Sequence, residues 1–327
     1  MRSTEKKVQQ TRSLVVISLA LSFLHFSLLA GATTPAPASA NGYDTITYSS
    51  NFTATTVDMN RTLKRGYKWY LLDLYNRQAS ASGVQLNADG SVSLLGDKTL
   101  AAGELATMAP YRGTNSFVGT TFGGGFYMEA VFNFNYAQVY ATHTPGLHLT
   151  TPAFWSLPLE ANVFPGANQW PGQAVGYQHN VEFDFFEADY WGKPTAYGMG
   201  LHDWWGIPKV TCPTGLCGLA FQNPTGERDV SATTDFTKYH TYGSLWVPAT
   251  ATTPGRVDGY FDGVLIGHER TWTQYTNQAP TPVGQPWAFG RLDQQHMFFI
   301  LGTGVGQPFN VKSVTVWQKD GSHNLVN

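Results

Sequence analysis

The chain has 327 residues, with 20 Lys and Arg against 22 Asp and Glu, a formal net charge of -2, and only 13% charged residues. Nucleic-acid binding needs Lys and Arg clustered on one face, and the basic residues here are scattered, so we expect no nucleic-acid partner. An aromatic fraction of 14% combined with low charge favours uncharged ligands such as sugars.

Residues 1–32 have the features of an export signal. Basic residues precede an apolar run over 14–32, and small-residue cleavage sites follow at 30–32 and 38–40. An uncleaved membrane anchor is the alternative, because an apolar run of about 20 residues can span a bilayer. We therefore expect a secreted protein, extracellular or periplasmic, that meets a membrane only if this segment stays uncleaved.

Residues 33–42 are rich in Pro, Ala and Thr, which predicts a short extended linker. No comparable linker follows it. Single all-β domains often reach about 250 residues, so we predict that residues 43–327 form one domain with sizeable loops. We expect this domain to be a monomer.

Short β-rich runs recur after the linker, separated by Gly, Pro and Asn. They are 91–95, 125–134, 181–186, 239–247, 257–261, 297–301 and 311–318. Asp262-Gly263 lies between two apolar arms and predicts a hairpin, because this dipeptide supplies a turn with positive φ. Sustained helical periodicity is absent from this region. The pattern predicts an all-β fold, a β-sandwich of two antiparallel sheets.

One aromatic strand carries three acids, Glu182, Asp184 and Glu187. Side chains alternate in a regular strand, so Glu182 and Asp184 share a face and Glu187 falls on the other. One β-bulge at Phe185-Phe186 would turn Glu187 onto the face of the other two acids, and bulges are frequent beside active sites. The resulting spacing is compatible with the carboxyl pair of a retaining glycosidase, which lies about 5 Å apart.

Two other interpretations of the three acids remain open. They are an exposed acidic edge that deters aggregation and a cation site built from carboxylates. The aromatic context favours a sugar site, because indole rings can stack on pyranose faces. The flanking tryptophans are Trp155, Trp170, Trp191, Trp204 and Trp205. Each alone is more often a core residue, so we select Trp155 and one of the pair Trp204 and Trp205 for substrate binding.

Cys212 and Cys217 are the only two cysteines, with four residues between them. An exported protein meets an oxidising environment, so we predict a disulfide that closes a small loop. A zinc site is not favoured, because no second cysteine pair or matching His cluster accompanies them.

The sequence resembles the family 16 glycoside hydrolases, in particular the laminarinase-like branch with its bulged Glu-x-Asp-x-x-Glu strand. Residues 152–158 are similar to the family's Pro-Ala-Phe-Trp segment. Residues 240–246 and 260–263 are similar to its His-Thr-Tyr and Val-Asp-Gly strands, and residues 314–318 resemble its last strand. The resemblance implies a concanavalin-like jelly roll with an open cleft on the concave sheet.

The resemblance also implies a secreted, endo-acting, retaining hydrolase of a β-linked polysaccharide, with β-1,3- or mixed-linkage β-glucan as the expected substrate. Glu182 would be the nucleophile and would have to stay ionised. Glu187 would be the general acid and base and would need a raised pKa, and Asp184 would assist. His202 looks like the family's His near the reacting sugar, and an ordinary residue at the cleft edge is an equal alternative.

Two departures from the family pattern affect the expected substrate and metal. Residues 123–130 lack the arginines that many relatives carry there. A galactan hydrolase of the agar or carrageenan type and a transglycosylase therefore remain alternatives, and so does a non-catalytic sugar-binding module of the same fold. Lys312 occupies the position of an Asp that helps to hold a structural calcium in many relatives, and the usual acidic pair is missing near residues 49–52. We expect no cofactor and no catalytic metal, and a structural calcium is not favoured.

Overall fold

The computed structural model describes residues 33–74, 77–95, 103–111, 114–142, 152–163, 173–188, 196–213, 215–222, 228–230, 233–278, 287–302 and 309–327. Contacts divide the chain into two compact units, Met1–Thr33 and Thr34–Asn327. The predicted export segment, residues 1–32, lies outside the described residues, and every element named below belongs to the second unit. No helix among the described residues is both long and apolar enough to cross a bilayer.

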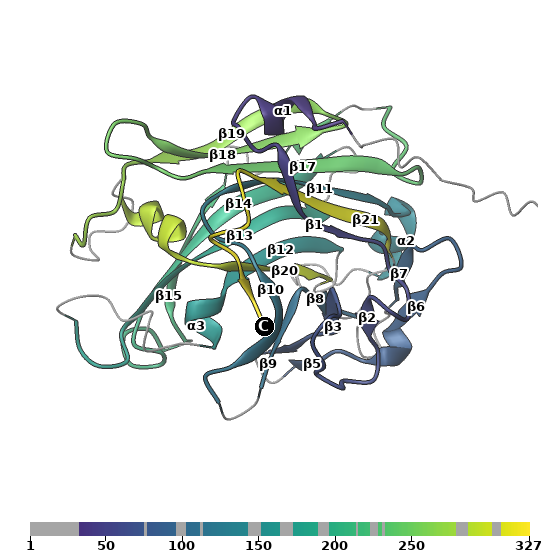
Figure 1. Cartoon of the computed structure of the whole chain (residues 1–327), viewed down its shortest axis with the longest axis horizontal. Helices are drawn as coiled ribbons and strands as arrows, with labels where there is room; N and C mark the ends of the chain where they lie inside the picture. Colours follow the sequence, from purple (N-terminus) through teal and green to yellow (C-terminus); the bar gives the residue numbers. More distant parts are fainter. Residues whose placement is uncertain are drawn as a thin grey trace, which may run out of the picture. The chain divides into compact units, whose positions relative to one another are not determined.

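The first large sheet, called the β11 sheet here, has eight antiparallel strands (Figure 1). Its order is β19-β18-β17-β11-β21-β7-β6, and β1 also pairs with β21. The strands are β1 (Thr45–Ser50), β6 (Val84–Leu86), β7 (Val92–Leu94), β11 (Phe126–Asn133), β17 (His240–Val247), β18 (Gly255–Phe261), β19 (Val264–Trp272) and β21 (Phe309–Gln318).

The second large sheet, the β13 sheet, has nine strands in the order β15-β14-β13-β12-β20-β8-β3-β2, with β16 also paired to β14. All its pairs are antiparallel except β2 with β3. The strands are β2 (Val57–Asp58), β3 (Trp69–Leu71), β8 (Leu105–Ala106), β12 (Ala153–Pro158), β13 (Gln178–Ala188), β14 (Ala196–Gly206), β15 (Cys217–Gln222), β16 (Arg228–Asp229) and β20 (Met297–Leu301).

The remaining elements are short. One small sheet joins β22 (Leu325–Val326), β10 (Phe117–Thr121) and β9 (Met108–Pro110), and another joins β4 (Asp73–Leu74) and β5 (Arg77–Gln78). The described helices are α1 (Ala36–Ser39), α2 (Tyr136–Thr142), α3 (Leu159–Asn162) and the 3-10 helices η1 (Ala81–Gly83) and η4 (Ala288–Gln294).

The two large sheets pack face to face on an aromatic core. Phe126 of β11 lies against Phe185 of β13 with ring centroids 6.1 Å apart, and Phe132 lies against Phe186 at 4.7 Å. All four rings are buried, and each buried Phe contributes roughly 1.5–3 kcal/mol of transfer free energy. The predicted β-sandwich is confirmed. Its open cleft stays a prediction, because the connections over 164–172 and 189–195 lie outside the described residues.

The predicted strands and hairpin are also present. Each of the seven predicted runs overlaps a strand, namely β7, β11, β13, β17, β18, β20 and β21. Between β18 and β19, Asp262 has φ of 48° and Gly263 has φ of 78°, and Phe261 pairs with Val264. A hairpin closed by a two-residue turn of type I′ requires positive φ at both central residues, and Asp and Gly both tolerate that conformation.

The structure differs from the extended linker predicted over residues 33–42. Ala36–Ser39 form the helical turn α1, and Ala38 is fully buried against the β11 sheet in a cluster with Tyr43, Leu245 and Trp317. Prolines are compatible with this turn because the first backbone N–H groups of a helix have no helical acceptor. Proline content was therefore a poor guide to extension here.

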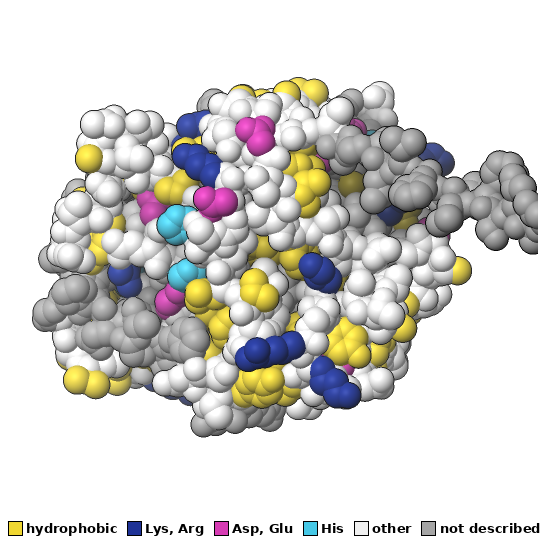
Figure 2. Space-filling model, in the orientation of Figure 1, with side chains coloured by type: hydrophobic (Ala, Val, Ile, Leu, Met, Phe, Trp, Pro, Cys, Tyr) yellow, Lys and Arg dark blue, Asp and Glu magenta, His cyan; other side chains and the backbone are white. Residues whose placement is uncertain are grey.

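The surface carries few charges. On the face drawn in Figure 2, most of the surface is uncharged, and Lys and Arg side chains stand singly or in pairs.

Candidate active site

Strand β13 presents two chemically different faces. Val181 and Phe183 are fully buried in the sandwich core, while Glu182 between them is half-buried on the opposite face. Asp184 follows on the same side as Glu182 and is 4% exposed. This alternation is the ordinary result of the pleat, in which successive side chains point to opposite faces.

A β-bulge interrupts the alternation after Asp184. On β14, Asp184 pairs with Gly200 and Glu187 pairs with Gly198, so three steps on β13 oppose two on β14. On β12, Asp184 pairs with Trp155 and Phe186 pairs with Phe154, the residue before it, so Phe185 is the extra residue. Both Phe185 and Phe186 are buried. The predicted bulge is therefore present, and it returns Glu187 to the face that carries the other two acids.

Asp184, Glu187 and His202 form a compact group beyond the core. Their ligating atoms all lie within 4.8 Å of one another. His202 comes from the neighbouring strand β14, where it pairs directly with Glu182, and its Nε2 lies 2.8 Å from Asp184 Oδ2. One oxygen of Glu187, Oε2, is buried without a hydrogen-bond partner among the described residues.

Burial dominates the protonation of these two carboxyls. Burial raises the pKa of Glu187 well above its ordinary value, and the neighbouring charges of Asp184 and Glu182 raise that pKa further, while His202 lowers it. Burial also raises the pKa of Asp184, to about 8. Desolvation disfavours the charged form of a carboxyl, so this pair retains a proton at neutral pH. A carboxyl that holds a proton at neutral pH can act as a general acid.

Glu182 has a different environment. The indole Nε1–H of Trp204 donates a hydrogen bond to Glu182 Oε2 at 2.7 Å. The His202 ring is parallel to the Trp204 ring, with an interplanar angle of 8° and centroids 5.9 Å apart. A donor aimed at a carboxylate oxygen favours its charged form and fixes its orientation. The site thus contains one carboxylate with a fixed donor and one carboxyl that keeps its proton.

The tryptophans selected from the sequence separate into different surroundings. Trp155 pairs with Asp184 across β12 and β13, and its Nε1–H donates to the carbonyl of Gly302 at 2.8 Å. Trp205 does not lie with the acids, because strand alternation turns it away from the face of Trp204. It packs in a separate cluster with Tyr177, Tyr275, Ile207 and Trp287. Trp170 and Trp191 lie outside the described residues.

A buried polar pair that was not predicted from the sequence lies beneath the site. His179 Nε2 and Asp203 Oδ1 are in direct hydrogen-bond contact, and both side chains are buried. Burial lowers the pKa of His179, although Asp203 raises it. The pair joins β13 to β14 on the side opposite the acids. Both residues occupy positions whose side chains point into the core when the strand alternates. A polar residue at such a position is the sequence signal that could have identified them.

The group of Asp184, Glu187 and His202 also has the donor types of a metal site. Calcium prefers oxygen ligands alone, so the imidazole does not fit it. For a smaller ion, ligand atoms about 2.1 Å from one metal lie about 3 Å or more apart. The 2.8 Å contact between His202 and Asp184 fits a direct hydrogen bond better.

Lys312, at the position where relatives carry a calcium-binding Asp, lies away from this site. Its ammonium is 5.7 Å from the centre of the Tyr239 ring.

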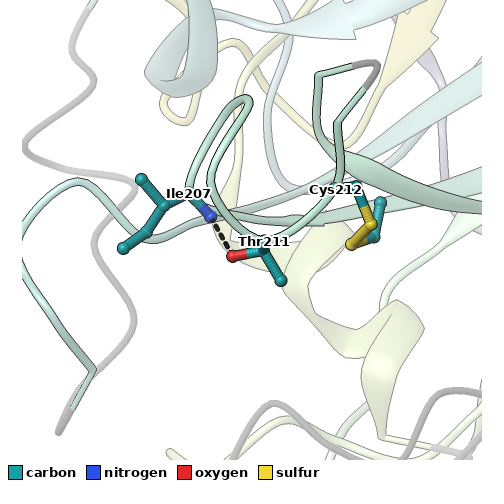
Figure 3. Close-up of a disulfide and its surroundings, with 4 residues drawn as sticks. Ile207, Thr211 and Cys212 are labelled. Carbon is teal, nitrogen blue, oxygen red and sulfur yellow. Dashed lines mark hydrogen bonds between the residues drawn. A yellow bond between two sulfur atoms is a disulfide. The ribbon is translucent and has the colours of Figure 1, made fainter.

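Cys212 and Cys217 form a disulfide with Cα atoms 5.3 Å apart (Figure 3). The bond closes the turn that leads from β14 into β15, and Ile207 N donates to Thr211 Oγ1 at 2.9 Å within the same turn. Cys217 pairs with Trp205 at the start of β15. The disulfide therefore lies at the edge of the β13 sheet, beside the strand that carries His202 and Trp204.

A cavity of about 490 Å³ lies apart from the acids. Its lining includes Tyr43, Gly125, Thr250, Tyr275 and Asp293. None of the proposed site residues contributes to it.

No family model and no curated protein matches the sequence. Several solved structures are similar in part. An endo-1,3-beta-glucanase from Streptomyces sioyaensis shares 17% identity over 86% of this chain and 97% of its own, with a TM-score of 0.44. A kappa-carrageenase from Pseudoalteromonas carrageenovora, in complex with an oligotetrasaccharide of kappa-carrageenan, shares 14% over 73% of this chain and 84% of its own, with a TM-score of 0.42. The VIP36 exoplasmic/lumenal domain shares 12% identity over 72% of this chain and 81% of its own, with a TM-score of 0.30. Similarity at this level does not decide the activity, which has to be argued from the site.

Proposed function

We propose that this chain is a secreted, endo-acting glycoside hydrolase that cleaves a β-linked polysaccharide with retention of configuration. The observation that carries the proposal is the bulge at Phe185, because it brings Glu182, Asp184 and Glu187 to one face of β13. Trp204 donates to Glu182, while burial raises the pKa of Glu187, and such a difference suits a nucleophile and a general acid in a carboxylate pair.

Each residue has a role in the proposed reaction. Glu182 attacks the anomeric carbon, oriented by the Trp204 N–H that it accepts. Glu187 gives its proton to the departing glycosidic oxygen, and a covalent glycosyl-enzyme forms on Glu182. Glu187, now ionised, removes a proton from water, and the resulting attack releases the sugar and restores both carboxyls. Asp184 and His202, which contact each other, set the electrostatic environment of Glu187: Asp184 raises its pKa and His202 lowers it.

A neutral β-glucan is the proposed substrate. The strands that carry the acids or lie beside them, β12, β13, β14, β15 and β20, contain no Lys or Arg, and the nearest one in the sheet is Arg228 of β16, at the Tyr197 end of β14. A sulfated galactan would place its sulfate groups beside the carboxylates without a cation from these strands to offset the repulsion. Neutral agarose remains compatible with the same floor, so the substrate panel includes it.

The first experiment measures new reducing ends from laminarin, lichenan, agarose and carrageenan. We expect release from laminarin or lichenan, and a large loss in Glu182→Gln and Glu187→Gln. Glu129→Gln is the matched control, since Glu129 is half-buried on the β11 sheet and accepts from Tyr127 Oη at 2.9 Å, which a Gln oxygen also does. Full activity in Glu182→Gln would overturn the catalytic assignment.

The same reaction mixtures separate the alternatives. The anomeric configuration of the first product, followed by proton NMR, should be that of the substrate if the enzyme is retaining. Products longer than the substrate would indicate transglycosylation. Binding to an insoluble glucan without product release, unchanged in Glu187→Gln, would indicate a binding module. Release from a galactan alone would move the proposal to the galactan hydrolases.

Export is part of the proposal. It is supported by the apolar segment at residues 14–32 and by the disulfide between Cys212 and Cys217, since disulfides persist in oxidising compartments. Intact-mass measurement of the protein recovered from the medium or periplasm tests it. A protein that stays membrane-bound with residues 1–32 attached would favour the anchor.

A further inference from the structure

The indole of Trp204 spans three strands of the β13 sheet. Trp204 belongs to β14, and its Nε1 edge donates to Glu182 of β13 at 2.7 Å. Its opposite edge lies over Gly218 of β15, the residue that pairs directly with it. A Cβ built on Gly218 would be 2.2 Å from Cζ3 and 2.3 Å from Cε3 of the indole. The ring is therefore confined between a glycine and the proposed nucleophile.

This confinement leaves the ring no room to move within its plane. Carbon atoms pack at about 3.5 Å or more, so a methyl group at Gly218 would push the ring edge by about 1 Å. The other edge is already at hydrogen-bond distance from Glu182. A rigid indole cannot shorten, so it would have to tilt out of position, and the donor would leave the carboxylate.

The backbone gives no other reason for a glycine here. Gly218 is not among the residues with positive φ, whereas Gly206 on β14 has φ of 106°. The three atoms nearest to a Cβ at Gly218 all belong to Trp204. The missing side chain at this position is therefore explained by the indole alone.

We infer that Gly218 is a positioning residue, whose missing side chain keeps the Trp204 N–H on Glu182. The effect of Gly218 on the Trp204 ring can be measured without a substrate, and its effect on catalysis rests on the proposed function. A hydrogen bond to an ionised carboxylate favours the charged form and fixes its orientation, so its loss weakens the charged form of Glu182 and leaves the nucleophile less well positioned.

The test compares Gly218→Ala with Gly321→Ala in the full-length chain. Gly321 is exposed, has no positive φ, and a Cβ there would meet its nearest atoms only at 3.7 Å. The indole N–H resonance of Trp204 is identified in protein labelled with ¹⁵N-tryptophan by its loss in Trp204→Phe. We expect it to titrate with Glu182 in the wild type, and to shift and stop titrating in Gly218→Ala but not in Gly321→Ala.

Activity is the second readout. Gly218→Ala should lower kcat/KM by about tenfold or more, which is the effect of losing one hydrogen bond to a charged group. The acidic limb of the pH profile should move to higher pH, as in Trp204→Phe. Gly218→Ala added to Trp204→Phe should cause little further loss, because the displaced donor is already absent. Gly321→Ala should match the wild type in both measurements.

Two outcomes overturn the inference. One is an unchanged, titrating Trp204 resonance in Gly218→Ala. The other is an equal loss from Gly218→Ala in the wild type and in Trp204→Phe, and this comparison also decides the case if the single variant folds poorly. A wild type that shows the titrating resonance but hydrolyses no polysaccharide would instead sink the proposed function and leave the inference about Gly218 standing.

Discussion

His202 Nε2 lies 2.8 Å from Asp184 Oδ2, so a residue on β14 is tied to the acid that stands between the two glutamates of β13. Asp184 is 4% exposed and cannot satisfy its oxygens from solvent. The imidazole gives Asp184 a fixed partner, and the pKa of Glu187 responds to both residues: Asp184 raises it and His202 lowers it.

Replacing His202 tests this contact. His202→Phe should lower kcat/KM by about 10- to 100-fold, because the hydrogen bond between the imidazole and the Asp184 carboxyl group is lost. His202→Gln keeps an N–H donor at a similar reach and should recover much of the activity. Steady-state kinetics of both variants provide the measurement. Equal activity of His202→Phe and the wild type would mean that the imidazole is only a neighbour of the site.

The alkaline limb of the pH–rate profile should report Glu187. A general acid is active only while it holds its proton, so a raised pKa moves the loss of kcat/KM to a higher pH than an ordinary Glu would give. Asp184 raises the pKa of Glu187 by charge repulsion. Asp184→Asn should therefore move the alkaline limb toward lower pH. A limb that stays in place would remove Asp184 from the control of Glu187.

The same carboxyls should make the protein less stable as pH rises. Asp184 and Glu187 have folded-state pKa values above the ordinary values of 3.8 and 4.5, so the folded state binds more protons than the unfolded state. The free energy of unfolding then falls as pH rises, for Asp184 from about 4 to about 8. Thermal melts from pH 5 to 9 measure this slope.

Glu187→Gln provides the comparison for that slope. Gln has the shape of the protonated acid but cannot ionise, so the variant should lose less stability with rising pH than the wild type. If the melting temperatures of the two proteins fell by the same amount as pH rose, Glu187 would not carry a raised pKa.

Much of this arrangement could be predicted from local pattern. The bulge was predictable because the spacing of Glu182, Asp184 and Glu187 breaks the two-residue period at one point, and two adjacent phenylalanines need the same side of the strand. The hairpin at Asp262-Gly263 was predictable because the turn's φ angles select those residues. Both features depend only on residues adjacent in sequence.

The features that escaped prediction depend on partners far apart in the chain. Gly218 has a role only because the Trp204 ring lies over it, and nothing in its own surroundings in sequence indicates that. One of Trp204 and Trp205 was expected at the site, and the sequence did not decide which; neighbours in a strand point to opposite faces, and Trp204 is the one that contacts Glu182. The hydrogen bonds of Asp293 could not be predicted, because its partners Trp246, Ala249 and Trp272 lie far from it in the sequence.

The disulfide should contribute local stability. In the chain-entropy model a loop of this size contributes about 2 kcal/mol, small because few residues are enclosed. Cys212→Ser/Cys217→Ser should therefore lower the free energy of unfolding by about 2 kcal/mol or less without loss of the fold, as measured by urea denaturation. Failure of the double variant to fold would indicate that the turn before β15 is needed for assembly of the β13 sheet.

Asp293 is a half-buried carboxylate outside the site that accepts three hydrogen bonds. Its Oδ1 accepts from Trp246 Nε1 at 2.9 Å, and its Oδ2 accepts from Trp272 Nε1 at 2.8 Å and from Ala249 N at 2.9 Å. Burial raises the pKa of Asp293 to about 6 although these bonds lower it. Since the folded-state pKa is raised, the stability that Asp293 contributes falls as pH rises from about 4 to about 6.

Asp293→Asn should remove that pH dependence and still destabilise the protein at pH 7.5. The amide keeps one acceptor oxygen, but its NH₂ group would face the N–H groups that Oδ2 now accepts, and leaving buried donors unsatisfied costs about 1–3 kcal/mol each. That cost exceeds what the neutral side chain gains in desolvation, so we expect a net loss of about 2 kcal/mol in urea denaturation. Asp320→Asn, on an exposed residue, should stay within about 0.5 kcal/mol of the wild type. If Asp293→Asn proved as stable as Asp320→Asn, the two indole bonds would contribute nothing beyond what burial of the charge costs.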